Sequence, residues 1–287
     1  MISVKRLLQA APSLMCNRFA GSSIGAESVK HEPDKDVLEK ATIHSSLLKP
    51  YVNEILKQDD PFHLNDLVKL EDLYKARVHY GHRASLNSFL IMLWLIQLVG
   101  TLHEKMKWAL FGERLGVCIF DLSLTKLFLI RALNFLAHVS FRGGIILFVS
   151  SDRANMLQIE DMAKAVGEYS HLRKWVPGTL TNMKLYVKYP IRLPDTIVLL
   201  PTLTSVLETH PAVLEATKLA IPTIGVVDSN SDPSYITYVV PGNDDSSASI
   251  LYFMDLFTKA IKRGKEARQE HIKKYGEIEE FPPAISR

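Results

Sequence analysis

The sequence predicts an α/β fold, a three-layer, open and doubly wound parallel sheet with helices on both faces. Short uncharged runs rich in β-branched residues, such as residues 145–149 and 223–227, are typical of strands buried on both faces of a sheet. Longer stretches with helical periodicity alternate with these runs along the chain. Right-handed crossovers then place helices on both sides of the sheet, as in a flavodoxin-like fold.

The elements follow one another from residue 115 onward, after a short amphipathic helix expected over residues 64–74. The expected strands cover residues 115–120, 145–149, 197–200, 223–227 and 237–240. The expected helices cover residues 122–140, 153–169, 212–220 and 247–274.

Composition allows one large α/β domain with extensions, or two small domains, in 287 residues. The net charge of +3 does not by itself indicate a nucleic-acid partner. Cys16 and Cys118 provide neither a disulfide framework nor a zinc site, which favours a reducing compartment.

The first 26 residues contain Lys5, Arg6 and Arg18, several serines and no acidic residue. This composition is typical of a mitochondrial transit peptide, and a disordered tail is the alternative. We therefore expect a transit peptide at 1–26, an N-terminal extension at 27–73, the α/β domain at 74–275 and a C-terminal tail at 276–287.

Residues 84–99 contain no charged residue and are largely apolar over residues 89–99. A membrane span needs about 20 such residues, so this stretch is at the lower limit. Three interpretations stay open: a buried helix, a short membrane-associated segment, or a stretch foreign to the domain. We expect no contribution of this segment to the sheet core and no stable membrane insertion.

Enzyme motifs are absent from the sequence. There is no G-x-G-x-x-G after a strand, no phosphate-binding P-loop and no G-x-S-x-G elbow. Asp228-x-Asn230-x-Asp232 imitates the start of a calcium loop, but Pro233 stands where that loop needs glycine. His79 and His82 could ligate a metal if they were helical, but Gly81 and the lack of adjacent cysteines or carboxylates favour a structural or RNA-facing turn.

Carboxylates at predicted strand ends leave one enzymatic alternative. Asp228 ends one strand, and Asp244 and Asp245 follow the next. Such residues can hold Mg²⁺ and phosphate in open α/β sheets. The simpler interpretation is that Asp228 shapes a turn and Asp245 caps a helix.

Basic residues concentrate in two places. Residues 259–274 hold seven lysines and arginines and two glutamates, a net charge of about +5. We interpret this side of the last helix as facing phosphate, with an ordinary charged surface as the alternative. A second cluster surrounds Pro177, where Trp175 and Tyr186 could stack on bases or pack inside.

Several segments together resemble the small-subunit ribosomal protein 2 family. They are V-H-Y-G-H at 78–82, G-I-I-L-F-V at 144–149, T-L-T-N at 179–182, L-P-D at 193–195, I-P-T-I-G-V-V-D-S-N-S-D-P at 221–233 and V-P-G-N-D-D at 240–245. They cover roughly residues 74–268 in the order of the family. Two departures are the apolar stretch at 84–99 and the short distance from Asn182 to Asp195, which leaves no room for the helical hairpin of bacterial members.

The resemblance implies a structural constituent of the mitochondrial small ribosomal subunit, located in the matrix, without catalysis, cofactor, metal or small-molecule substrate. Its implied partners are ribosomal RNA and neighbouring ribosomal proteins. The candidate contacts are His82, Arg83, Lys105, Lys107, Arg114, Arg173, Lys174, Lys184, Lys188, Arg192, Lys262, Arg263, Lys265 and Arg268. The turns that carry family motifs contain Asn182, Asp228, Asn230, Asp232, Asn243, Asp244 and Asp245.

Overall fold

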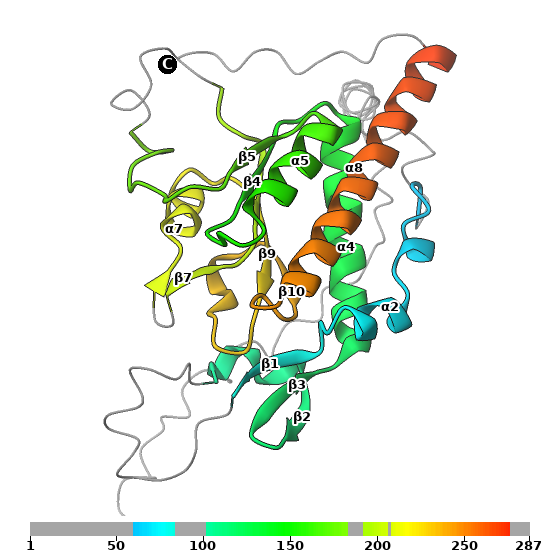
Figure 1. Cartoon of the computed structure of the whole chain (residues 1–287). Helices are drawn as coiled ribbons and strands as arrows, with labels where there is room; N and C mark the ends of the chain where they lie inside the picture. Colours follow the sequence, from blue (N-terminus) through cyan, green and yellow to red (C-terminus); the bar gives the residue numbers. More distant parts are fainter. Residues whose placement is uncertain (1–59, 84–101, 183–191, 206–207, 276–287) are drawn as a thin grey trace, which may run out of the picture. The chain divides into compact units, whose positions relative to one another are not determined.

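A five-stranded parallel sheet forms the centre of the fold (Figure 1). The computed structural model describes residues 60–83, 102–182, 192–205 and 208–275, which all belong to the second of two units, residues 50–287. The strands of this sheet are β4 (Ile146–Val149), β5 (Tyr169–His171), β6 (Thr196–Leu199), β9 (Thr223–Val227) and β10 (Tyr238–Pro241). Their order is β10-β9-β6-β4-β5 and all neighbours are parallel, which is the flavodoxin-like order with its reversal between β4 and β6. The predicted fold class is confirmed.

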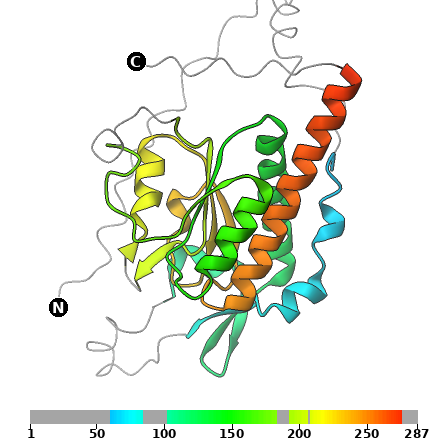
Figure 2. The ribbon, with the colours of Figure 1, turned by 45° about the horizontal axis from the view of Figure 1, so that its top comes forward.

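Helices cover both faces of this sheet (Figure 2). α4 (Leu122–Phe141), α5 (Met156–Val166) and α8 (Ser247–Tyr275) lie on one face, and α7 (Pro211–Lys218) lies on the other. Side chains of β4 alternate between the two layers, as strand geometry requires. Ile146 and Phe148 pack with α4, α5 and α8, whereas Val149 packs with α7. The three predicted layers are therefore present.

Local signals set the ends of these helices. The Asp121 carboxylate accepts a hydrogen bond of 2.8 Å from the Ser123 N–H and caps α4. α5 ends where Gly167 adopts a φ of 73°, a conformation that glycine reaches without steric cost. The imidazole of His210 caps α7 by accepting from the Ala212 N–H at 3.2 Å, directly before Pro211.

A second sheet of three antiparallel strands corrects one prediction. It contains β1 (Tyr80–Arg83), β2 (Leu110–Arg114) and β3 (Val117–Phe120) in the order β1-β3-β2. The strand expected over residues 115–120 is β3, but it belongs to this sheet and not to the parallel one. Leu115 and Gly116 have φ angles of 55° and 75° and form the turn that returns the chain from β2 to β3.

Other boundaries differ from the prediction in smaller ways. The helix expected over residues 64–74 is a 3₁₀ turn, η4 (Asn65–Leu67), followed by α2 (Leu70–Lys75). Tyr169 was expected in a helix, but it starts β5 because Gly167 ends α5. The elements that the sequence did not predict are η5 (Glu104–Ala109), β1, β2, β5, β7 (Leu203–Ser205), β8 (Glu208–Thr209) and η6 (Pro233–Tyr235).

α4 is long and apolar enough to cross a membrane, the one such helix among the residues described. Its Leu129, Leu133 and Leu136 are fully buried in the core that α4 shares with α8 and the sheet. It is therefore the core helix of this domain. The apolar stretch at 84–99, the transit peptide and most of the segment between Asn182 and Asp195 lie outside the described residues, so the predictions about them stay predictions.

Candidate functional site: an acidic rim and a basic surface

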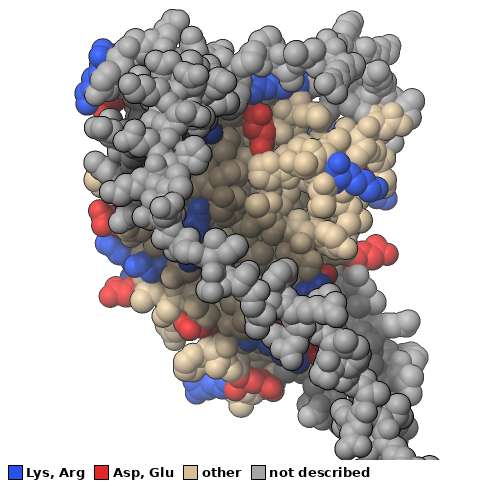
Figure 3. Space-filling model, turned by 180° about the vertical axis from the view of Figure 1, so that it is seen from behind, with Lys and Arg blue, Asp and Glu red and all other residues tan. Residues whose placement is uncertain are grey.

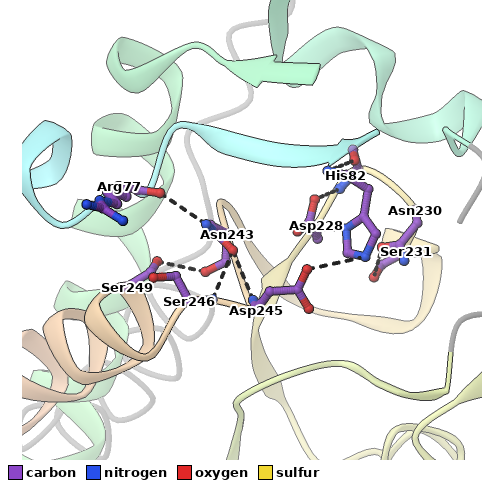
Figure 4. A network of polar contacts seen from close by, with 10 residues as sticks. Arg77, His82, Asp228, Asn230, Ser231, Asn243, Asp245, Ser246 and Ser249 are labelled. Atoms are coloured by element: carbon purple, nitrogen blue, oxygen red, sulfur yellow. Dashed lines mark hydrogen bonds and ion pairs between the residues drawn. The ribbon is translucent and has the colours of Figure 1, made fainter. Parts of the chain in front are cut away.

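Two adjacent strands bring the carboxylates of the family motifs to one edge of the sheet. β9 ends at Val227 and is followed by Asp228, and β10 ends at Pro241, three residues before Asp244. Because β9 and β10 are parallel neighbours, their carboxyl ends meet at the same edge. The segment that carries His82 crosses this edge as β1 (Figure 4). Three stretches thus converge on one site, and that of His82 lies more than 140 residues from the other two in sequence.

Asn243 connects these stretches. Its side-chain oxygen accepts hydrogen bonds from the N–H groups of Asp245 at 2.9 Å and Ser246 at 3.2 Å, at the start of α8. Its amide group donates to the Arg77 carbonyl at 3.2 Å, on the segment leading into β1. The Ser249 hydroxyl in turn donates to the Asn243 carbonyl at 2.7 Å. Both ends of the asparagine amide are needed, which explains why an aspartate would not serve here.

His82 lies between two of the carboxylates. Its Nδ1 is 3.1 Å from Asp228 Oδ2, and its Nε2 is 3.4 Å from Asp245 Oδ2 (Figure 4). Its backbone N–H also donates to the Ser229 hydroxyl at 3.0 Å. Ligand atoms of His82, Asp228, Asp244 and Asp245 all lie within 4.8 Å of one another. We call these four residues the acidic rim.

The acidic rim is electrostatically uneven. A hydrogen bond to Asp228 raises the pKa of His82 to about 9, against the opposing effect of burial, so the imidazole is charged at neutral pH. Burial, and then the charges of Asp228 and Asp245, raise the pKa of Asp244 well above its usual value. One cation therefore faces three carboxylates, of which Asp244 is disfavoured as an anion.

Such a set of oxygen and imidazole ligands could hold a divalent metal ion. The sequence argument against a metal assumed that no carboxylates cluster near the histidines. That assumption is wrong for the folded chain. Asp228, Asp244 and Asp245 lie beside His82, although they are more than 140 residues away in sequence. His79 is not part of this group; its ring stacks on Tyr74 at 4.6 Å between centroids.

The remaining motif residues of this loop form turns. Asp232 accepts from the Ser234 N–H at 3.0 Å and so starts η6. Lys105 reaches the Asp232 carboxylate at 3.3 Å and the Ser234 hydroxyl at 2.6 Å. Asn230 accepts from the Ser231 hydroxyl at 3.3 Å. Lys105, a predicted RNA contact, thus forms an intramolecular ion pair with Asp232.

A buried glutamate that the sequence analysis did not single out organises the T-L-T-N turn. Glu215 on α7 is 6% exposed and accepts hydrogen bonds from the Trp175 indole at 3.1 Å and from the N–H groups of Gly178 at 2.6 Å and Leu180 at 2.8 Å. A longer bond of 3.4 Å comes from the Thr181 N–H. We call Glu215 with these four donors the Glu215 turn. The signal was available, because Glu215 shares the apolar helix face of Ala212 and Ala216.

The basic side of α8 contributes partly to the protein interior. Arg263 donates to the carbonyls of Phe62 and His63. Lys265 pairs with the buried Glu168 at 2.6 Å and donates to the Val166 carbonyl at 2.6 Å. The Arg268 guanidinium lies against Gly143, where a side chain would collide with it. Of the four α8 candidates, Lys262 is the exposed one.

The other predicted contacts occupy separate places on the surface. Exposed side chains belong to Lys107, Arg114, Arg173, Lys174, Asn182 and Arg192. Arg192 pairs with Asp195 at 3.0 Å. Lys184, Lys188 and the side chain of Arg83 lie outside the described residues. On the face seen in Figure 3, lysines and arginines are interspersed with acidic residues and do not form a single-sign patch.

Comparison with known proteins agrees with this geometry. The model of the family "Ribosomal protein S2" matches residues 97–192 and 187–264. "Small ribosomal subunit protein uS2m" of Bos taurus is 43% identical over 253 residues, which cover 88% of this chain and 78% of the relative. "Small ribosomal subunit protein uS2" of Granulibacter bethesdensis is 31% identical over 75% of this chain and 93% of its own length. "Small ribosomal subunit protein uS2m" of Neurospora crassa is 31% identical over 70% of this chain and 48% of its own length. The chain belongs to the ribosomal protein S2 family.

Proposed function

We propose that this chain is a structural component of the mitochondrial small ribosomal subunit and supports translation in the mitochondrial matrix. The observation that carries the proposal is the 43% identity to uS2m of Bos taurus across 88% of the chain. The acid-free residues 1–26, which are typical of a transit peptide, support the same compartment. The partners are small-subunit ribosomal RNA and neighbouring ribosomal proteins.

The division of the chain follows from this role. Residues 1–26 direct import, residues 27–73 form an extension that contacts neighbours, and residues 74–275 form the ribosomal domain. Phe62 and Leu64 of the extension are buried in the same core as the domain, which supports a firmly attached extension at least from residue 60. Residues 84–99, which lie outside the described residues, are assigned to an insertion in this division.

RNA contact falls to the basic residues that the fold leaves exposed. Lys107, Arg114, Arg173, Lys174 and Lys262 have exposed side chains. Lys107 is paired only loosely with its neighbour Glu104, at 3.6 Å across exposed side chains. Arg263 and Lys265, by contrast, are used within the chain. Phosphate contacts of this kind supply affinity without sequence specificity.

The enzymatic alternative gains no support. Ligands of open α/β sheets bind at the carboxyl ends of the strands where the strand order reverses, which here is between β4 and β6. Asp228 and Asp244 follow β9 and β10, on the other side of β6. The family to which the chain belongs is named for a ribosomal protein.

Sedimentation tests the assignment. A matrix extract is run on sucrose gradients with and without EDTA, and this chain is followed by immunoblotting. We expect it to migrate with the small subunit in both conditions. Recovery at the top of both gradients would contradict the proposal, and pelleting with membranes would redirect attention to residues 84–99.

A matched pair of variants tests the RNA surface. Arg173→Glu with Lys174→Glu reverses exposed charges, and Glu208→Lys with Glu113→Lys alters exposed acidic residues of the same domain. Binding of small-subunit RNA should weaken about tenfold or more for the first pair, with a shallower salt dependence between 50 and 200 mM. The second pair should not weaken binding. Equal binding by wild type and the arginine–lysine variant would remove this surface from the proposal.

A further inference from the structure

One side of α4 presents apolar and basic side chains at the surface. Leu124, Leu127, Phe128 and Arg131 recur at intervals of three and four residues, so they share one face of the helix. Leu127 is 44% exposed and Arg131 is exposed, whereas Leu124 and Phe128 are half-buried. α4 contains no acidic residue, and only 33% of its most apolar stretch is buried. We call these four residues the open side of α4.

The open side of α4 has the composition of a surface that another segment covers. The Trp108 ring, itself 44% exposed, lies 4.8 Å from the Phe128 ring between centroids. The Arg131 guanidinium lies 5.3 Å from the centroid of the same Phe128 ring. Together these side chains form an apolar patch with a cation at its border. Because a helix that is apolar on all sides is normally buried on all sides, we expect another segment to lie on this patch.

The amino-terminal extension already contacts the next position of this face. His138 follows Arg131 by seven residues, about two turns of helix, and so lies on the same side of α4. The Phe62 ring packs on the rings of His138 and Phe141, at 5.0 Å and 6.3 Å between centroids. From there the chain runs along α4 towards its amino end, where α2 packs against it (Figures 1 and 2). Asp60, where the described chain begins, therefore lies near the carboxyl end of the open side.

The ten residues before Asp60 have the pattern of a helix that fits this surface. Residues 50–59 read P-Y-V-N-E-I-L-K-Q-D. A proline suits the first turn of a helix, and the four apolar residues, at 51, 52, 55 and 56, fall on one face of that helix. Ten helical residues extend about 15 Å, which equals the length of α4 from His138 back to Phe128.

Charge and tethering both favour this segment as the cover. Glu54 precedes Asp60 by six residues, much as Arg131 precedes His138 by seven, so the two opposite charges come to the same level. The covalent link to Asp60 holds the segment at a high effective concentration, which no separate partner has. RNA fits less well, because the three apolar side chains of the open side offer no donor to a phosphate.

We propose that residues 50–59 form a helix that docks on the open side of α4. Tyr51 and Ile55 pack on its leucines and its phenylalanine, and Glu54 lies beside Arg131. The contact continues the one that the extension already makes with the same helix, and it covers an apolar surface of the free chain. It does not depend on the ribosomal assignment, since both surfaces belong to one chain.

Photo-crosslinking tests the contact in the full chain. p-Benzoylphenylalanine replaces Tyr51, an equal mixture of ¹⁵N-labelled and unlabelled chains is irradiated, and cross-linked peptides are mapped by mass spectrometry. We expect cross-links to residues 124–131, joining peptides of the same isotope. Mixed-isotope cross-links would assign the open side to a second copy and overturn the proposal. Cross-links to the apolar residues 84–99, or cross-links scattered over the surface, would also overturn it.

Matched substitutions in the segment separate docking from chance proximity. Ile55→Asp removes an apolar contact and should lower the cross-link yield about fivefold or more. Lys57→Asp introduces the same side chain on the opposite face of the proposed helix and should leave the yield unchanged. Glu54→Arg should lower the yield only about twofold, the size expected for one exposed ion pair, and adding Arg131→Glu should restore it.

Substitutions on the helices test the other half of the contact. Leu127→Asp on α4 should lower the yield as much as Ile55→Asp does. Leu157→Asp on α5 is the control, because Leu157 is 69% exposed and lies on another helix. Circular dichroism checks that both variants stay folded, as expected for exposed positions. An unchanged yield in Ile55→Asp would overturn the proposal whatever the variants of α4 show.

Discussion

The Glu215 turn and the acidic rim both follow strand ends of one sheet, yet their carboxylates are held in opposite ways. Glu215 receives four N–H donors, and these outweigh burial and lower its pKa. Asp244 has like charges as neighbours, and its pKa is raised. The two histidines differ in the reverse sense, since the pKa of His82 is raised to about 9 and that of His210, beside the Glu215 turn, is lowered to about 4.

The difference shows how to tell an anchor from a binding site. A buried carboxylate with a full set of donors fixes the backbone around it and has no capacity left for a ligand. A carboxylate crowded by other carboxylates gains from any added cation. Glu215 therefore belongs to the framework, whereas the acidic rim contains carboxylates that an added cation would stabilise.

Glu215→Ala should have the largest effect on stability. It removes the acceptor of the Trp175 indole and of two short backbone N–H bonds, all of them buried or partly buried. We expect the free energy of unfolding to fall by about 3–5 kcal/mol, because each buried or partly buried N–H donor left without its acceptor costs about 1–3 kcal/mol. Urea unfolding followed by circular dichroism measures it.

The matched control for this variant is Glu208→Ala, because Glu208 is exposed and lies outside the Glu215 turn. It should change the free energy of unfolding by less than about 0.5 kcal/mol. Similar losses for Glu208→Ala and Glu215→Ala would mean that the Glu215 turn has no special role.

Lys265→Met tests whether a carboxylate with enough hydrogen-bond donors becomes unfavourable when it loses one, as the carboxylates of the acidic rim are. Glu168 is nearly buried and is satisfied by Lys265 at 2.6 Å and by the Ile146 N–H at 3.1 Å. Removing the lysine leaves this carboxylate short of donors, and we expect a loss of about 2–3 kcal/mol in urea unfolding. Lys262→Met on the same helix removes an exposed charge and should cost under about 0.5 kcal/mol. A larger loss from Lys262→Met would reverse the assignment of the two lysines.

Features that depend on local sequence were predictable, and contacts between distant segments were not. The fold class and the three layers were predictable because buried β-branched runs and helical periodicity depend on local composition. Asp228 and Asp244 were correctly placed at strand ends, for the same reason. The approach of His82 to them was not predictable, because β1 lies in a separate sheet that no local pattern indicates.

The basic residues of α8 illustrate a second limit. Counting charges predicts one basic helix side, but Arg263 and Lys265 turn inward to carbonyls and to Glu168. Their partners come from residues near 62 and 168, about 200 and 100 positions away. Sequence spacing carries no information on such pairs, and the assignment of these two residues to RNA stays a prediction.

His210 should make the domain less stable in mild acid. Burial first, and then the charge of His171, lower the pKa of His210 from 6.5 to about 4. The unfolded chain therefore binds a proton at a higher pH than the folded one, and stability is lost as the pH falls below about 6.5. Between pH 7.5 and pH 5 the expected loss in the free energy of unfolding is about 2 kcal/mol. The lowered pKa of Glu215 adds to this loss at still lower pH.

His210→Asn is the variant for that experiment. Asparagine keeps a capping oxygen for the Ala212 N–H but does not titrate. Urea midpoints measured from pH 7.5 to pH 5 should fall less steeply in the variant than in the wild type. Parallel curves would exclude His210 as the source of the acid sensitivity.

Asp244→Asn should have the smallest effect on the free energy of unfolding. It should raise this free energy, whereas Glu215→Ala should lower it. The amide removes a carboxylate that Asp228 and Asp245 disfavour as an anion, so at pH 7.5 in EDTA we expect a gain of about 1 kcal/mol, at the lower end of the repulsion between charges roughly 4–5 Å apart. Near pH 5 the gain should shrink, because Asp244 of the folded wild type then binds a proton more readily than in the unfolded chain. Zn²⁺ or Mg²⁺, added after EDTA has been removed, tests whether the acidic rim binds an ion. An ion held there would raise the Tm of the wild type and not that of Asp244→Asn. A loss of stability on Asp244→Asn in EDTA would mean that this carboxylate, like Glu215, is an anchor, and the contrast between the two sites would fail.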